Sequence, residues 1–276
     1  MMADVDKPEL VASDVDGTLL DPMELITPRT AGVIARVTAS DVPFVLVSGR
    51  PPRWIPGVAN AAGLNGYAVC ANGAALYDIA ADRVISAHDL DPLRLHDTAQ
   101  TVRNVLPEAR MATERIGDGL VPFVTEPGFR NPWGNPAGEQ DGEVNDVPIG
   151  EVLGHPATKL MVRHPGMTSQ EMAEAVAEVL AGADLEVTYS TNQGLIEISA
   201  AGVTKASGLA EVCERLSVDQ HRVVAFGDMP NDLPMLRWAG HGVAMANAHP
   251  QVLAAADEVT APNAEDGVAQ VLERWF

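Results

Sequence analysis

The chain is poor in cysteine and lacks metal-site cysteine motifs. Its 276 residues include only Cys70 and Cys213, and neither belongs to a Cys-x-x-Cys motif. No cluster of cysteine and histidine has the ligand spacing of a zinc site. Two isolated cysteines are typical of a reducing cytosol, although one disulfide between them stays open at this stage. We therefore expect a cytoplasmic protein.

Basic residues and long apolar runs are also scarce. The net charge is −20 and the isoelectric point is near 4.5, which argues against partners such as nucleic acid or an anionic membrane surface. No apolar run reaches the roughly 18 residues of a membrane span, and the first ten residues have no signal core. An anionic substrate would need a local metal ion or lysine to overcome the general negative field.

Residues 10 to 20 carry the strongest local pattern. The apolar run from Leu10 predicts a buried strand, which ends in Asp14 and Asp16, followed by Gly17. Side chains two residues apart on an extended chain point the same way, so the two carboxylates should project together. They repel each other unless a cation lies between them or they have different roles. An ordinary strand followed by an Asp-Gly turn would look similar in isolation.

Two further apolar strands end in polar motifs. Residues 43–47 precede Ser48, and residues 222–226 precede Gly227 and Asp228. In a parallel α/β sheet, ligands bind outside the carboxyl ends of the strands, so these motifs should converge with Asp14 and Asp16. Carboxylate oxygens are ligands suited to magnesium. Taken singly, Asp228 is also a common helix cap and Ser48 a common turn residue.

Lys205 is the most informative single residue. It lies in the first turn of a predicted helix, where a cation opposes the helix dipole. A lysine there could reach an anion held at the helix N-terminus, although a solvated surface lysine is the ordinary alternative.

The order of predicted elements indicates two domains. Helices are predicted at 29–40, 55–63, 92–106, 168–180, 203–216, 232–238, 250–255 and 267–275. Strands are predicted at 10–12, 43–47, 67–70, 75–77, 84–86, 109–114, 120–125, 159–163, 185–189, 195–198, 222–226 and 242–245, with a loop at 131–136. This order favours an α/β, doubly wound (Rossmann-like) parallel-sheet core at 1–88 and 191–276, with an α+β unit inserted at 89–190.

Four motifs in sequence order resemble those of haloacid dehalogenase (HAD) superfamily phosphatases of the Cof type. They are Asp14-Val-Asp-Gly-Thr18, Val47-Ser-Gly-Arg50, Gly202-Val-Thr-Lys-Ala206 and Gly227-Asp-Met-Pro-Asn-Asp-Leu233. The resemblance covers 1–88 and 191–276, and the insert at 89–190 lies where the family places a type IIB cap that sets substrate specificity.

The resemblance implies a role for each acidic motif residue. Asp14 would attack phosphorus and form an aspartyl-phosphate, while Asp16 would protonate the leaving alkoxide and then deprotonate water. Mg²⁺ would be held by Asp14, the backbone carbonyl of Asp16, and Asp228. Arg50 would either reach substrate or pair with an acidic surface residue.

The resemblance also implies a phosphate-binding set. Ser48 and Lys205 would stabilise the phosphoryl oxygens, and Gly49 would offer its backbone N–H. Asn231 and Asp232 would orient Lys205, the phosphate or a metal-bound water, with Asn231 counted among the phosphate-binding residues and Asp232 lying behind them.

We therefore expect a magnesium-dependent phosphatase that hydrolyses a small phosphorylated metabolite, most simply a sugar phosphate. Two alternatives stay open: a phosphosugar mutase of the same superfamily, and a non-catalytic phosphometabolite-binding protein. The sequence leaves the oligomeric state, the exact substrate and the extent of cap motion undetermined.

Overall fold

The structure, a computed structural model, describes residues 6–117, 119–130 and 146–276. The described chain forms two compact units, one made of residues up to Ser86 together with Thr204–Phe276, the other of Ala87–Val203. The loop predicted at 131–136 lies outside the described residues.

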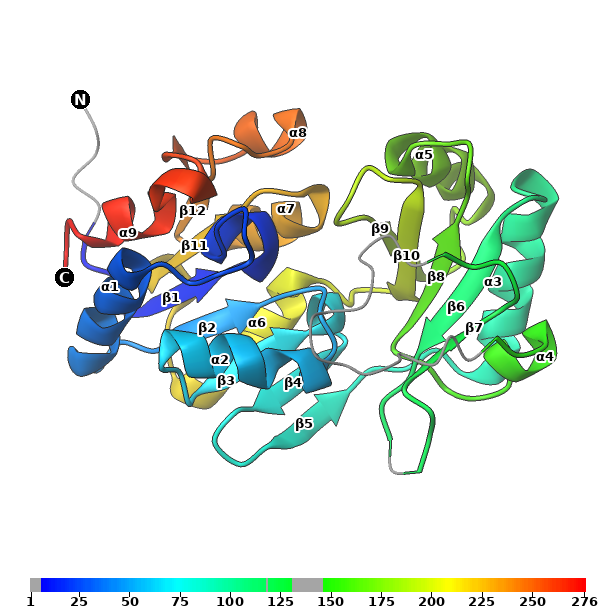
Figure 1. Ribbon diagram of the computed structural model, residues 1–276, viewed down its shortest axis with the longest axis horizontal. Coiled ribbons are helices and arrows are strands. Elements are labelled where there is room, and N and C mark those ends of the chain that lie inside the picture. The colour runs from blue at the N-terminus through cyan, green and yellow to red at the C-terminus, as the bar shows by residue number, and fades with distance from the viewer. Residues whose placement is uncertain (1–5, 118, 131–145) are drawn as a thin grey trace. The chain divides into compact units, whose positions relative to one another are not determined.

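The first unit is built on an eight-stranded sheet (Figure 1). Across the sheet the strands are β13 (Glu258–Val259), β12 (His241–Ala244), β11 (Val223–Gly227), β1 (Leu10–Ser13), β2 (Phe44–Val47), β3 (Tyr67–Cys70), β4 (Ala75–Asp78) and β5 (Arg83–Ala87). The pairs from β13 to β3 are parallel, and β4 runs antiparallel to β3.

The strand order reverses direction at β1. The chain builds outward from β1 through β2 and β3, and later returns to build β11, β12 and β13 on the other side of β1. In open α/β sheets, ligands bind at the carboxyl ends of the strands beside such a switch point. The topology therefore places the site at the ends of β1 and β11.

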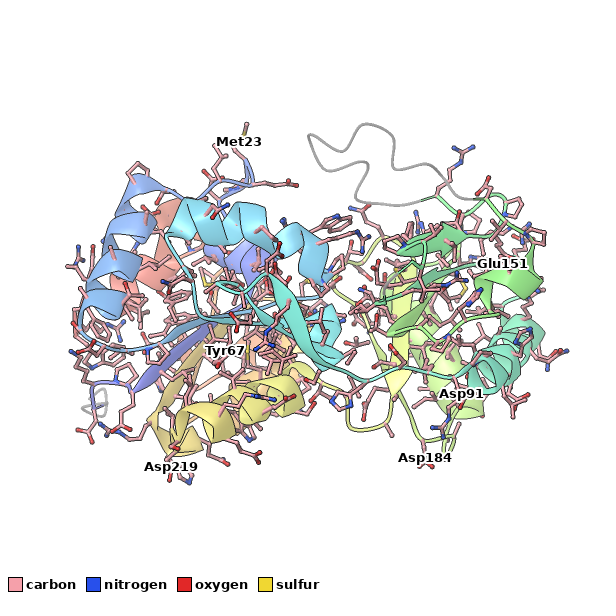
Figure 2. All side chains as sticks on the ribbon, turned by 90° about the horizontal axis from the view of Figure 1, so that it is seen from below. Met23, Tyr67, Asp91, Glu151, Asp184 and Asp219 are labelled. Carbon is pink, nitrogen blue, oxygen red and sulfur yellow. The ribbon has the colours of Figure 1, made fainter. Side chains whose placement is uncertain are left out.

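Helices cover both faces of this sheet. They are α1 (Pro28–Ala39), α2 (Ile55–Ala62), α6 (Lys205–Leu216), α7 (Leu233–Trp238), α8 (Pro250–Leu253) and α9 (Gly267–Leu272). Helix α1 packs with α2 and α9, and α6 packs with α7. Figure 2 shows α1 and α2 (blue) on one side of the sheet and α6 (yellow) on the other. This is the doubly wound arrangement that the sequence predicts.

The second unit is a five-stranded antiparallel sheet with helices. The strand order is β7 (Phe123–Thr125), β6 (Arg110–Glu114), β8 (Lys159–Arg163), β10 (Leu195–Ala200) and β9 (Leu185–Thr188). Helices α3 (Pro92–Val105) and α5 (Ser169–Val179) pack together, and α4 (Ile149–Val152) packs on β6 and β7. This unit has the predicted α+β character.

The second unit is longer than the expected insert of 89–190. Strand β10, expected to rejoin the first sheet, pairs instead with β8 and β9 in the second sheet. Its Glu197 is buried there in an ion pair with Lys159, Nζ to Oε1 at 2.7 Å. A short apolar run fits either sheet equally well, so the pattern could not assign it, and the chain returns to the first unit only at Thr204.

Both cysteines of the chain lie within the described residues. Cys70 and Cys213 are both free and buried, and burial raises the pKa of the Cys213 thiol to about 11. Within the ranges that the structure describes, no helix combines the length and apolar character needed to cross a bilayer.

A close backbone approach joins the end of β3 to the start of α6. A Cβ added at Gly73 would lie 2.0 Å from the carbonyl oxygen of Thr204, and Gly73 has φ +101°. Thr204 is the N-cap of α6, so this contact fixes where the helix that carries Lys205 begins.

We expect Gly73→Ala to lower the free energy of unfolding by about 2–4 kcal/mol, because overpacking adds to the strain of a positive φ. Gly63→Ala is the matched control, since Gly63 has φ +67° and no atom within 4 Å of an added Cβ. Its expected loss is about 1 kcal/mol, from backbone strain alone. Urea denaturation measures both, and equal losses would contradict the packing argument.

Candidate active site

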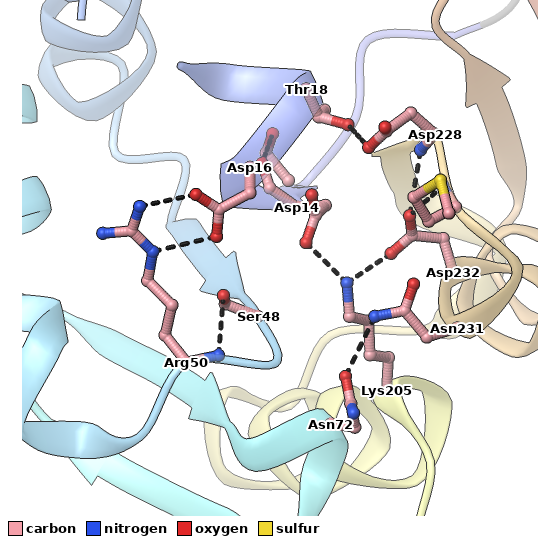
Figure 3. A network of polar contacts seen from close by, with 12 residues as sticks. Asp14, Asp16, Thr18, Ser48, Arg50, Asn72, Lys205, Asp228, Asn231 and Asp232 are labelled. Atoms are coloured by element: carbon pink, nitrogen blue, oxygen red, sulfur yellow. Dashed lines mark hydrogen bonds and ion pairs between the residues drawn. The ribbon is translucent and has the colours of Figure 1, made fainter. Parts of the chain in front are cut away.

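The ends of three adjacent strands bring the predicted motifs together (Figure 3). Asp14 follows β1, Ser48 follows β2 and Asp228 follows β11. The backbone N–H of Asp14 donates to the carbonyl of Phe226 at 2.9 Å, which ties the ends of β1 and β11 together. Side chains more than 200 positions apart in the sequence, such as Thr18 and Asp228, therefore share one site.

Lys205 lies at the centre of this site. It is the first residue of α6 and is only 1% exposed. Its Nζ donates to Oδ1 of Asp14 and to Oδ1 of Asp232, each at 2.5 Å. Burial alone would lower the pKa of Lys205, but the charges of Asp14 and Asp232 outweigh it and raise the pKa. The lysine is therefore a permanent cation, held where the helix dipole alone would disfavour it.

Asp232 holds two parts of the site in place. It closes the turn Pro230–Asp232, and its Oδ2 accepts the backbone N–H groups of Asp228 and Met229, both at 2.9 Å. Its other oxygen accepts from Lys205. Both oxygens are thus engaged by the protein, one by Lys205 and the other by the backbone.

The loop after Asp16 closes tightly over Asp228. Thr18 donates its hydroxyl to Oδ1 of Asp228 at 2.8 Å. A Cβ on Gly17 would lie 2.4 Å from Oδ2 of Asp228, and the φ of Gly17 is +78°. Asn247 donates its Nδ2 to the Gly17 carbonyl at 2.9 Å. Thr18 closes the first motif, and the sequence predicted no role for Thr18 or for Asn247.

The buried acidic groups fit a divalent cation. Asp14, Asp228 and Asp232 offer oxygen atoms within 4.8 Å of one another, and all three residues are buried. Lys205 neutralises only one of these three charges. Burial, followed by repulsion from neighbouring carboxylates, raises the pKa of Asp14 despite Lys205 and raises the pKa of Asp228 to about 7.

The donor chemistry also favours particular ligands. Hard carboxylate oxygens suit Mg²⁺, which keeps several waters and needs few protein ligands. Because the protein engages both oxygens of Asp232, Asp14 and Asp228 are the residues that could hold the ion. The sequence names the same two side chains.

Asp16 and Arg50 form an ion pair at the edge of the site. Arg50 donates from Nε to Oδ2 of Asp16 at 2.8 Å and from Nη2 to Oδ1 at 2.5 Å. The side chain of Asp16 is 54% exposed, that of Arg50 only 20%. Of the two roles open to Arg50, the structure shows pairing with an acidic residue. Asp14 and Asp16 follow the same strand but contact different partners (Figure 3).

Ser48 and Asn231 lie where the phosphate-binding set was expected. Ser48 is buried, and its Oγ accepts the backbone N–H of Arg50 at 3.0 Å. Asn231 is also buried, and its Nδ2 donates to Oδ1 of Asn72 at 3.0 Å. The sequence predicted no role for Asn72. An Asn-Gly pair directly after an apolar strand is the pattern that could have identified it.

The raised pKa of Asp228 gives a pH prediction for the metal-free protein. Its carboxyl group has a pKa of about 7 when folded, against an ordinary value of 3.8. Between pH 3.8 and about pH 7, the Asp228 carboxyl group has lost its proton in the unfolded chain but retains it in the folded protein. The free energy of unfolding therefore falls as the pH rises through this range. We expect Asp228→Asn to remove this fall and to stabilise the protein by roughly 2–4 kcal/mol at pH 8 in chelator.

Urea denaturation at pH 5 and pH 8 in chelator measures this difference, with the exposed Asp41→Asn as control. Magnesium at pH 8 should stabilise the wild type and not the Asp228→Asn variant. If Asp228→Asn is no more stable than the wild type at pH 8, the Asp228 carboxylate does not carry a destabilising negative charge in the metal-free protein.

Comparison with known proteins agrees with this geometry. A family model described as haloacid dehalogenase-like hydrolase matches residues 11–272. A 5-amino-6-(5-phospho-D-ribitylamino)uracil phosphatase of Bacillus subtilis is 31% identical over 98% of both chains. A pyridoxal phosphate phosphatase of Escherichia coli is 27% identical over 95% of this chain and 97% of its own length.

A solved subclass IIB sugar phosphatase has the same fold, with a TM-score of 0.77 at 21% identity, covering 96% of this chain and 98% of that protein. The predicted family and fold class are thus confirmed. Since the family model spans nearly the whole sequence, the chain belongs to the haloacid dehalogenase-like hydrolase family.

Proposed function

We propose that the protein is a magnesium-dependent phosphatase that hydrolyses a small phosphorylated metabolite through an aspartyl-phosphate on Asp14. As a member of its family, the chain is an enzyme that hydrolyses phosphoric monoesters. The proposal concerns the residues, the metal and the substrate. The observation that carries it is the buried Lys205, bonded to both Asp14 and Asp232 where the strands end.

In the first half-reaction, a carboxylate oxygen of Asp14 attacks phosphorus and the ester P–O bond breaks. Asp16 gives a proton to the departing alkoxide oxygen. In the second half-reaction, water attacks the phosphorus of the aspartyl-phosphate while Asp16 takes up a proton from it. Orthophosphate leaves, and the carboxylate of Asp14 is restored.

The remaining residues stabilise negative charge on the transferring group. Lys205 supplies a fixed cation, and Ser48 and the backbone N–H of Gly49 supply hydrogen bonds. Fixed donors of this kind are usually the largest contribution to catalysis. Magnesium held by Asp14 and Asp228 would neutralise further charge on the phosphoryl oxygens.

The substrate class follows from the relatives only in outline. Their names refer to a phosphorylated ribitylaminouracil and to pyridoxal phosphate, and the structural neighbour is named a sugar phosphatase. Small phosphorylated metabolites are common to all of them. A sugar phosphate is our expected substrate, and a panel of sugar, polyol and cofactor phosphates tests it.

A phosphosugar mutase is less favoured by the second unit. A mutase must bind a second anionic group, for which this unit would need available cations. Lys159 pairs with Glu197, Arg103 with Glu126, and Arg94 lies 3.8 Å from Asp184. A non-catalytic binding protein is disfavoured as well, because the nucleophile and the lysine are both present and bonded.

The first test is phosphate release from an aryl phosphate by the wild type and Asp14→Asn. We expect activity with magnesium, little in chelator, and a loss of at least about 10³-fold in the variant, because the nucleophile is gone. Asp41→Asn, an exposed carboxylate, is the control. Unchanged activity in Asp14→Asn would remove Asp14 from the mechanism.

A second test separates Asp16 and Arg50 from the other residues. An alkyl phosphate needs a proton on its leaving oxygen, whereas p-nitrophenyl phosphate does not. We expect Asp16→Asn to lower kcat/KM for the alkyl ester by about 10²–10⁴-fold and much less for the aryl ester.

Arg50→Gln should also change the alkyl-to-aryl ratio, because Arg50 contacts Asp16 through two nitrogens. If Arg50 served substrate binding alone, both esters would show the same rise in KM and an unchanged ratio.

A further inference from the structure

We propose that Asn72 is a positioning residue of the phosphoryl-transfer site, whose carboxamide oxygen fixes the orientation of the Asn231 side chain. This inference rests on the proposed function, because Asn231 is one of its phosphate-site residues. Asn72 itself contacts no reacting atom in this assignment.

The backbone around Asn72 is strained. The turn Ala71–Gly73, which follows β3, contains three consecutive residues with positive φ: +49°, +58° and +101°. Residues other than glycine rarely adopt this conformation, and then usually one at a time. Strain of this kind persists only where the surrounding structure imposes it, and it is concentrated at functional sites.

Neighbouring segments of the active site impose the turn. The backbone N–H of Ala71 donates to the Arg50 carbonyl at 2.9 Å, and that of Asn72 donates to the Ser48 carbonyl at 3.0 Å. Gly73 packs against the carbonyl of Thr204, next to Lys205. The turn thus contacts the segments that carry both proposed phosphate donors, Ser48 and Lys205.

The side chain of Asn72 extends this network to a further motif. Its Oδ1 accepts the Nδ2 of Asn231 at 3.0 Å, and each residue is 5% exposed. The same oxygen lies 3.2 Å from the position that a Cβ on Gly49 would occupy. Asn72 therefore lies against Gly49 and bonds to Asn231, two residues of the expected phosphate-binding set.

This hydrogen bond determines which atom of the Asn231 amide has no protein partner. Oδ1 of Asn231 is buried and has no hydrogen-bond partner among the residues that the structure describes. A buried acceptor without a donor is destabilising, and the oxygens of a phosphate dianion carry no proton to donate, so a water is the complement it requires. Without Asn72, the amide could turn by 180° and present its donor end instead.

Two variants separate the side chain of Asn72 from its backbone. Asn72→Gly and Asn72→Ala both remove the carboxamide, but only glycine tolerates φ +58° without strain. If the side chain positions Asn231, both variants should lose about 10- to 100-fold in kcat/KM for p-nitrophenyl phosphate. Only Asn72→Ala should be further destabilised, because alanine does not tolerate this φ.

Asn231→Ala and the double variant Asn72→Gly/Asn231→Ala complete the comparison. Because Asn72 acts through Asn231, the double variant should lose no more than about twofold beyond Asn231→Ala alone. Asp41→Gly is the matched control, since Asp41 is exposed, has φ +58° and precedes β2, at the opposite end of that strand from Ser48. It should keep wild-type kinetics.

Three results would overturn the proposal. The first is a wild-type kcat/KM in Asn72→Gly. The second is a loss of kcat/KM that follows the loss of stability, so that Asn72→Ala is affected and Asn72→Gly is not. The third is a double variant whose loss of kcat/KM is the product of the losses in the two single variants. A wild type that releases no phosphate would instead contradict the proposed function.

In that case the side-chain amide of Asn231, identified in NMR spectra by its loss in Asn231→Ala, still tests the inference. Its protons should be protected from exchange in the wild type and unprotected in Asn72→Gly. Equal protection in both would overturn it without reference to activity.

Discussion

The site depends on one buried ammonium group shared between two carboxylates. Lys205 bonds to Asp14 and Asp232 at a point with almost no access to water. Removing charges from water is costly unless each is paired and hydrogen-bonded, so this arrangement requires its neighbours to be in place. Asp232 meets the requirement by also accepting two backbone N–H groups, while Asp14 is anchored by its own N–H to Phe226. The ion pairs therefore couple the start of α6, the end of β1 and the end of β11 into one unit.

The same constraint explains where glycine is needed. Gly17 allows the loop to touch the Asp228 carboxylate, and Gly73 allows the end of β3 to touch the N-cap of α6. Each contact places backbone within a distance that any side chain would block. Both glycines lie beside a charged residue of the site, so these contacts set the positions of Asp228 and Lys205 and not only the course of the chain.

The fold class and most residues of the site follow from the sequence, because parallel strands with apolar runs place the residues after Ser13, Val47 and Gly227 at one edge. Lys205 stood out because a cation in a first helical turn needs a compensating partner.

Other features of the structure could not be predicted from the sequence. The run in β10 fits either sheet, and its pairing with β8 and β9, together with the buried ion pair of Glu197 with Lys159, reveals its place. The partner of Arg50 depends on a side-chain contact between two loops, and the bond from Asn231 to Asn72 joins residues 159 positions apart.

The charge of the site governs its affinity for an anionic substrate. The chain carries a net charge of −20, and the three buried carboxylates outnumber the one lysine between them. A phosphate dianion entering this environment alone would meet repulsion from Asp14 and Asp228 that Lys205 cannot offset. Burial, followed by repulsion from Asp232, raises the pKa of Asp228 to about 7, so that a proton can take the place of a missing positive charge. Cation and phosphate should therefore bind with positive coupling, each lowering the electrostatic cost of the other.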